Sequence, residues 1–337
     1  MKKRGLVLTL AVLLTLTAGC GKKQEAAEAP SEEVSPDTVI LTVDNREVPA
    51  WRYLYWLTYD RERITAQYRD AGLEPDWTAP AEDGGTLADY IQQQALADTA
   101  LYATVENWAD ARSISPSEAD LSALETQAAD WAANSHFQCF SALGLGAPEA
   151  LELLTDAWLY ARMAERFAAG DWDPAPTEAD ITAFAEAENW LTLDWVRLTP
   201  GDGGQEACRT RAAELFSRLN SGEDPSAVFS SLPEDLGSTG SQTFQTGTGV
   251  LPASIEEAAL ALEAGQWSGV LEDGSSCYLL LRQSLDTGAV TGAYFDHLLL
   301  SAAGSADITE TDAFRLLDTR SLLETSEPSS KANSSGA

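Results

Sequence analysis

The stretch Leu191 to Leu198, LTLDWVRL, decides the fold of the second half of this chain of 337 residues. Its apolar and polar side chains largely alternate, which is the pattern of a strand with one buried face. A Gly-rich turn follows at Pro200 to Gly204, and a helix is expected from Glu206 to Leu219. This strand therefore opens a unit in which strands and helices are mixed.

Three more segments complete that unit. A polar stretch rich in Gly, Ser and Thr runs from Ser230 to Gly249 and is expected to be a loop. A short helix is expected from Ile255 to Leu262, and a final strand, SCYLLLRQ, from Ser276 to Gln283. The order strand, helix, loop, short helix, strand predicts a small α/β domain of about ninety residues.

The first half of the chain is predicted to be mostly helical. Ser117 with Asp120, and Thr177 with Asp180, have the spacing of capping boxes, which we interpret as two independent helix starts. Between them, Ala147 to Ala169 carries apolar residues at helical spacing and is expected to pack in a core. The predicted fold class is therefore α+β, a mostly helical domain with a small α/β domain inserted or appended.

The N-terminus predicts export. Positive residues at positions 2–4 precede a mostly apolar run, Gly5 to Leu16, which fits a signal-peptide core and is too short to span a bilayer. The ending Ala18-Gly19-Cys20 resembles a bacterial lipoprotein signal, in which Cys20 becomes the lipidated residue. An ordinary cleavable signal is the alternative, because Thr17 stands where leucine is usual. The following polar stretch has the composition of a disordered tether.

Charge and residue usage exclude several classes of function. The chain has 21 Lys and Arg against 53 Asp and Glu. This balance argues against binding to nucleic acid and against adhesion to anionic lipid, because both need a basic face. The acidic residues are dispersed and predict solvated helix faces, so we expect no metal site and no cofactor. The cysteines and histidines are few: Cys20, Cys139, Cys208, Cys277, His136 and His297. A disulfide, preferably Cys208–Cys277, and three free thiols are both compatible with this count. His136 with Cys139 alone would make a weak metal pair.

Taken in order, these segments resemble the extracytoplasmic foldases of the SurA and PrsA type, in which a helical chaperone domain is paired with a parvulin peptidyl-prolyl isomerase domain. The opening VILTVDNREVPAWRYLYW, from Val39 to Trp56, is similar to the family's first strand, turn and helix. Ile114 to Ala168 is similar to the remaining helices, and Arg211 to Pro225 to the parvulin helix and its exit. The clearest segment, IEEAALALEAGQWS from Ile255 to Ser268, looks like the parvulin helix-turn. The resemblance covers roughly residues 37–285.

The chain departs from the family at the isomerase site. The family places one histidine on the first strand of the parvulin domain and one on the last. Here Asp194 to Leu198 contains no histidine, and Leu279 stands near the second position. What carries over is an apolar surface that would bind proline, with no catalytic residue. Its residues are Phe244, Val250, Leu251, Ile255 and Leu279.

We therefore expect a factor that is lipid-anchored through Cys20 on the extracytoplasmic face of a bacterial cell membrane and binds unfolded or nascent exported polypeptides. Its degenerate prolyl isomerase domain is expected to be weak or inactive; an active isomerase with an altered apolar pocket is the alternative. A solute-binding lipoprotein ranks last, because the repeated βα pattern of two large lobes is missing. The predicted segments are a signal peptide (1–20), a disordered tether (21–37), a helical chaperone domain (38–175), a connecting helix (176–190), a parvulin-like domain (191–285), a C-terminal helix packing on the chaperone domain (286–325) and a disordered tail (326–337).

Overall fold

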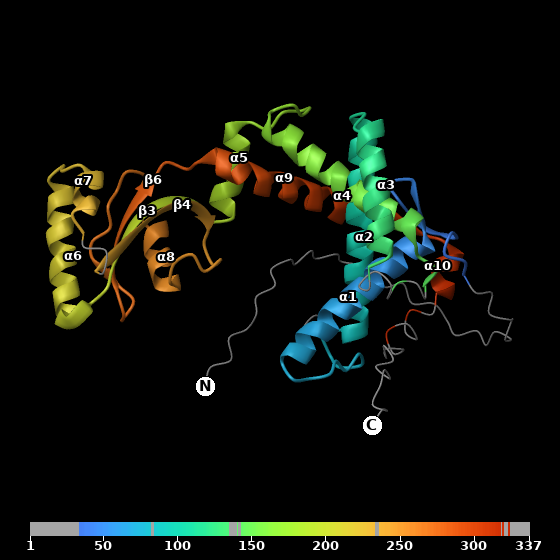
Figure 1. Cartoon of the computed structure of the whole chain (residues 1–337), viewed down its shortest axis with the longest axis horizontal. Helices are drawn as coiled ribbons and strands as arrows, with labels where there is room; N and C mark the ends of the chain where they lie inside the picture. Colours follow the sequence, from blue (N-terminus) through green and yellow to red (C-terminus); the bar gives the residue numbers. More distant parts are fainter. Residues whose placement is uncertain are drawn as a thin grey trace, which may run out of the picture. The chain divides into compact units, whose positions relative to one another are not determined.

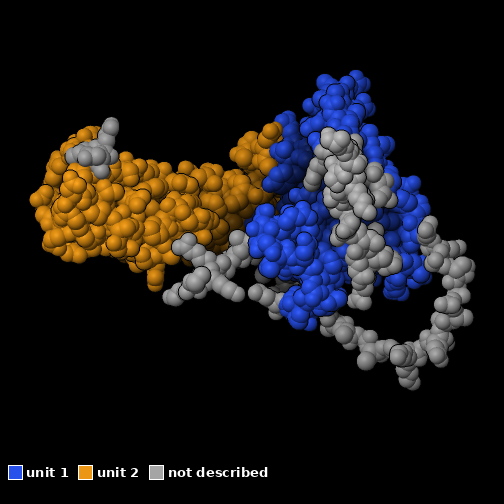
Figure 2. All heavy atoms as spheres, turned by 60° about the horizontal axis from the view of Figure 1, so that its bottom comes forward, with its two compact units in different colours: residues 1–163, 297–337 blue, residues 164–296 orange. Residues whose placement is uncertain are grey.

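The structure, a computed structural model, describes residues 34–81, 84–134, 140, 143–232, 236–317, 319 and 323. The expected leader with Cys20, most of the tether, the tail, His136 and Cys139 lie outside the described residues. The chain divides into two compact units, Met1–Met163 with His297–Ala337, and Ala164–Asp296 (Figure 2). Because the second unit lies in sequence between the two segments of the first, it is an insertion.

Unit 1 combines long helices with a three-stranded antiparallel sheet in the order β2-β1-β7. Strands β1 (Val39–Val43) and β2 (Arg46–Pro49) form a hairpin. Its two turn residues, Asp44 and Asn45, have φ of 49° and 68°, the left-handed pair that a two-residue hairpin turn needs. The helices are α1 (Ala50–Asp70), α2 (Leu87–Ala111), α3 (Glu118–Ala132), α10 (Asp312–Leu316), most of α4 (Ala147–Ala168) and the last part of α9 (Thr287–Gly304) (Figure 1).

The predicted helix starts are confirmed by their caps. Ser117 Oγ accepts a hydrogen bond from the Asp120 backbone N–H at 3.2 Å, and the Asp120 carboxylate accepts one from the Ser117 N–H at 3.1 Å. Thr177 and Asp180 make the same capping box at α5 (Glu178–Ala187). Each box satisfies backbone donors that a helix start otherwise leaves open.

The segment predicted as one C-terminal helix contains three elements. Helix α9 (Thr287–Gly304) is followed by strand β7 (Ile308–Glu310), which pairs with β1, and by α10. Thr311 holds the end of β7 against β1, because its backbone N–H donates a hydrogen bond to the Ile40 carbonyl at 2.8 Å. A strand of three residues is too short to show a period in the sequence, so only its long-range pairing defines it.

Unit 2 is built on a four-stranded antiparallel sheet in the order β4-β3-β6-β5. Its strands are β3 (Trp190–Leu198), β4 (Gly237–Gln245), β5 (Leu271–Glu272) and β6 (Cys277–Gln283), and its helices are α5, α6 (Gly204–Asn220), α7 (Pro225–Ser230), α8 (Ala253–Leu260) and the first part of α9. The α+β fold class is confirmed, because long helices are combined with two small antiparallel sheets.

Strand β4 corrects the loop expected over 230–249. Its sequence, GSTGSQTFQ, is small and polar, yet it pairs residue by residue with β3, from Gln245 opposite Trp190 to Gly237 opposite Leu198. As the edge strand it carries few buried side chains, so hydropathy could not mark it.

Helices cover both faces of this sheet (Figure 1). On one face α6 packs with Cys208 and Leu215 against Val196, Leu198 and other sheet residues. On the other face α8 packs with Ile255 and Ala259 against β3, β4 and β6. Among the described residues, no helix is long and apolar enough to cross a membrane.

Candidate functional site

The candidate site is the face of the four-stranded sheet that packs against α8. Side chains alternate across a strand, so Leu191, Leu193 and Trp195 of β3 project to this side. The register places Phe244 opposite Leu191, and Leu280 opposite Trp195, which continues the face over three strands. We call it the α8 face. Its members are Leu191, Leu193, Phe244, Leu251, Ile255, Ala259, Tyr278 and Leu280, with Trp195, Val250, Leu262 and Leu271 partly buried against them.

Trp195 is the largest partly exposed side chain of the α8 face. Its indole lies against β4 at Gly240, since a Cβ added to Gly240 would come within 2.1 Å of Trp195 Cζ2. The Phe244 ring meets the indole edge-on, with centroids 6.5 Å apart and planes at 78°. The missing side chain at Gly240 is therefore what makes room for the indole.

Four of the five residues predicted to form an apolar surface come together on the α8 face: Phe244, Val250, Leu251 and Ile255. Phe244, Leu251 and Ile255 are only 3%, 7% and 1% exposed, so they form the core of the face. Val250 is half-buried, like Trp195. A ligand would therefore meet Val250 and Trp195, while the buried residues support them.

The structure does not bring Leu279 together with the other four. Leu279 lies opposite Val196, and both pack with Cys208 on the α6 side of the sheet. Its neighbours Tyr278 and Leu280 take the α8 face instead. Sequence reasoning missed Tyr278 because the first four residues of β6 are all buried, so the run CYLL shows no alternation that would assign its faces.

A buried carboxylate fixes the connection between β4 and α8. Glu256, which is 3% exposed, accepts hydrogen bonds from the backbone N–H groups of Gly247 at 2.7 Å and Leu251 at 3.1 Å. These bonds hold the segment that carries Val250 at the start of the helix. They also satisfy a group whose burial would otherwise be costly.

The phenol of Tyr278, at the start of β6, is hydrogen-bonded to a carboxylate of the preceding turn. Its Oη donates to Asp273 Oδ2 at 2.9 Å, and Asp273 Oδ1 also accepts from the Ser275 and Ser276 backbone N–H groups. Burial raises the pKa of Asp273, but these hydrogen bonds outweigh it and lower that pKa to about 2. The pair thus ties the β5–β6 turn to the sheet, and at neutral pH Asp273 holds no proton to give.

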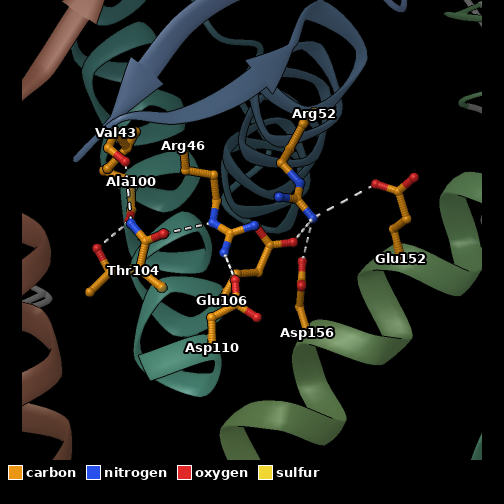
Figure 3. A network of polar contacts seen from close by, with 10 residues as sticks. Val43, Arg46, Arg52, Ala100, Thr104, Glu106, Asp110, Glu152 and Asp156 are labelled. Carbon is orange, nitrogen blue, oxygen red and sulfur yellow. Dashed lines mark hydrogen bonds and ion pairs between the residues drawn. The ribbon is translucent and has the colours of Figure 1, made fainter. Parts of the chain in front are cut away.

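Unit 1 contains a second cluster of polar groups, centred on Arg52 (Figure 3). Arg52 Nη2 from α1 donates to Glu106 Oε1 of α2 and to Asp156 Oδ2 of α4, each at 2.8 Å, and lies 3.9 Å from Glu152 Oε2. Arg46 extends the network through ion pairs with Glu106 and Asp110. These contacts join three helices through a side chain that is only 4% exposed.

Acidic groups outnumber basic ones in this network. Burial and the neighbouring Glu106 and Glu152 raise the pKa of Asp156 to about 8, although Arg52 lowers it. A similar pair lies between α1 and α2, where burial and the charge of Asp60 raise the pKa of Asp98 to about 7. No group of three or more potential ligands among the described residues could hold a metal ion. We assign both clusters to helix packing, because their members bond one another.

No protein-family model matches the chain, and none of the curated proteins matches it. Among solved structures, PrsA from Bacillus subtilis matches at 15% identity over 72% of this chain and 97% of that chain, with a TM-score of 0.25. The foldase PrsA from Lactococcus lactis matches at 13% identity over 85% and 99% of the two chains, with a TM-score of 0.28. A SurA-like chaperone from Campylobacter jejuni matches at 10% identity over 81% and 99%, with a TM-score of 0.23.

Identities and TM-scores this low say nothing about activity. They do not assign a substrate or a catalytic residue to this chain. The solved structures named here are two PrsA foldases and a SurA-like chaperone.

Proposed function

We propose that this chain is an exported folding factor that binds unfolded polypeptides, and that its α8 face binds their apolar segments with weak or no isomerase activity. The observation that carries the proposal is the composition of the α8 face. It is apolar and aromatic throughout, and its margin offers the half-buried Trp195 and Val250 to a ligand. Such a surface suits apolar side chains, proline included.

The proposed weakness of the isomerase follows from what surrounds that face. Rotation about a peptide bond to proline needs no covalent intermediate, but its barrier is about 18–20 kcal/mol. The segment from Trp190 to Gln283 contains no histidine. Trp195 fills space on β4, and Tyr278 is bonded to Asp273. An apolar surface of this kind can remove water from the peptide bond before proline. It offers few polar groups that would stabilise the twisted bond of the transition state.

The location belongs to the same proposal. The Lys- and Arg-containing leader, the apolar run and Ala18-Gly19-Cys20 support export and lipid anchoring at Cys20 on the outer face of the cell membrane. Replacing Cys20 by Ser should move the protein from the membrane fraction to the soluble fraction of the cell envelope. Retention in the membrane would contradict the anchor.

The test of binding uses the chain from Gly21 onward and an unrelated protein that aggregates as it unfolds. We expect stoichiometric amounts to slow its aggregation, and we expect Trp195→Ser to weaken that effect more than threefold. The matched control is Leu260→Ser, because Leu260 is an exposed apolar residue of α8 that does not belong to the α8 face. Equal protection by all three proteins would exclude the α8 face as the binding surface.

A prolyl-isomerisation assay on a series of Xaa-Pro peptides separates the two versions of the proposal. Catalysis no more than a few-fold above background, together with protection from aggregation, is the expected result. Strong catalysis that Trp195→Ser abolishes would instead establish an active isomerase with an altered apolar pocket. If the unaltered chain neither slows aggregation nor catalyses isomerisation, the folding-factor proposal itself is overturned.

A further inference from the structure

Two cysteines meet in the core between α6 and the sheet. Cys208 lies in the first half of α6, and Cys277 is the first residue of β6. Both side chains are fully buried in the same apolar cluster, with Val196 and Leu198. Their elements are far apart in sequence, so the fold alone brings the two thiols together.

The contacts around these thiols place them side by side. Cys208 Sγ donates to the backbone carbonyl of Leu198 at 3.3 Å, and Leu198 is the register partner of Cys277 across β3 and β6. The Cys208 thiol also lies near enough to that of Cys277 to help raise its pKa. Gln205, one turn before Cys208, donates from Nε2 to Cys277 Sγ at 3.6 Å. Cys208 of α6 and Cys277 of β6 therefore lie next to each other in the core.

We propose that Cys208 and Cys277 form a disulfide bond when the chain folds in an oxidising compartment, and that this bond links α6 covalently to the sheet. Both thiols are reduced in the structure. The expected signal peptide would deliver the chain to a compartment where such bonds persist.

The reaction is thiol–disulfide exchange with a small disulfide such as oxidised glutathione. The Cys208 thiolate attacks one sulfur of the oxidant, forms a mixed disulfide and expels one thiolate. The Cys277 thiolate then attacks the Cys208 sulfur, the Cys208–Cys277 bond forms, and the second thiolate leaves. The two protein thiols lose two electrons and two protons. The oxidant takes up both and departs as two thiols.

The structure also limits when this reaction occurs. Burial, together with the Cys208 thiol, raises the pKa of Cys277 to about 12, so almost none of its reactive thiolate exists in the folded chain. The oxidant must therefore reach the pair before α6 closes over β6. Once formed, the bond is shielded by the same burial from soluble reductants.

The bond would constrain the unfolded chain over the loop from Cys208 to Cys277, which contains α7, β4, α8 and β5. A loop of this length predicts a substantial entropic stabilisation. The consequence for function is that the α8 face, which is formed by residues of this loop, of β3 and of β6, stays ordered outside the cell.

The test refolds the full chain, after denaturation in reductant, with a mixture of reduced and oxidised glutathione or with reduced glutathione alone. We expect a peptide map of the oxidised sample to contain a cross-link between the Cys208 and Cys277 peptides. We expect its thermal midpoint to exceed that of the reduced sample by roughly 5 °C or more. Adding oxidised glutathione to the folded, reduced chain should form the bond at least tenfold more slowly.

Variants identify the partners without relying on one protein that could fail to fold. Cys139→Ser should keep both the cross-link and the stability difference, whereas Cys208→Ser and Cys277→Ser should each remove both. Alkylation of both residues after unfolding of the oxidised sample, with no reductant added, would overturn the proposal. A cross-link from either residue to Cys20 or Cys139 would overturn it equally.

Discussion

The indole of Trp195 occupies the space that a side chain at position 240 would need, since a Cβ there would lie 2.1 Å from Trp195 Cζ2. The two residues face each other in the register of β3 and β4. Glycine is therefore a packing requirement of this strand, and the exposure of Trp195 depends on it.

Replacing Gly240 by Ala should displace the indole. We expect a loss of about 1–3 kcal/mol in the free energy of unfolding, because an added methyl group in a packed contact forces side chains or backbone to move. Denaturant unfolding measures this loss. Gly269→Ala is the control, because no atom lies within 4 Å of a Cβ placed there and its backbone lies outside the left-handed region. A Gly240→Ala chain as stable as the control would contradict this placement of Trp195.

Removing Arg52 should destabilise unit 1 strongly. Arg52→Ala would leave Glu106 and Asp156 without their shared cation in a buried setting, and we expect a loss of about 3–5 kcal/mol. Arg209→Ala is the matched control, because Arg209 also pairs with two carboxylates but its side chain is 49% exposed. The control should lose less than about 1 kcal/mol. Comparable losses in the two variants would show that the Arg52 network is not buried in solution.

The sequence predicts the helices of this fold better than its short strands. Ser117 with Asp120 and Thr177 with Asp180 carry local signals, because a helix cap is made by residues close in sequence. Strand β4 has no such signal, because its small polar residues pair at a solvent-facing edge. Strand β7 is defined only by its pairing with β1, which lies near the other end of the sequence.

In the candidate site, too, the residues with local sequence signals could be predicted and those defined by long-range pairing could not. Ile255 and Leu251 could be placed from the helix-turn around them, and both lie on the α8 face. Leu279 could not be assigned to a face, because a strand covered on both sides loses the alternation that separates its sides. The role of Trp195 was hidden as well, since it depends on Gly240, which is distant in sequence and adjacent only after β3 and β4 pair.

The stability of the chain should fall as pH rises from about 5 to about 8. The pKa of Asp156 is raised on folding to about 8 and that of Asp98 to about 7, so the folded chain holds these protons more tightly than the unfolded chain. Each carboxyl group has a pKa near 4 in the unfolded chain. Between that value and its pKa in the folded chain, the folded state binds more protons, so the free energy of unfolding falls as pH rises. Thermal midpoints measured across this pH range should decline by several degrees.

Asp156→Asn tests the assignment of that slope. An amide cannot ionise, so the variant should lose less stability than the unaltered chain between about pH 5 and pH 8, while Asp98 maintains part of the decline. Asp120→Asn is the control: Asp120 is a capping carboxylate whose pKa is lowered by its bonds to Ser117, so its contribution changes only at acidic pH. A pH profile of Asp156→Asn that is parallel to that of the unaltered chain would exclude Asp156 as the titrating group.

Glu256 should hold the α8 face together through the connection that follows β4. Glu256→Ala leaves the backbone N–H groups of Gly247 and Leu251 without their buried acceptor, and we expect a loss of about 1–3 kcal/mol in the free energy of unfolding. Glu257→Ala is the matched control, because its side chain is exposed on the same helix. Hydrogen exchange supplies a readout that separates a local loosening from global unfolding. The amides of Gly247 and Leu251 should exchange faster in Glu256→Ala while those of β3 stay protected, and unchanged exchange at both amides would contradict the role assigned to this carboxylate.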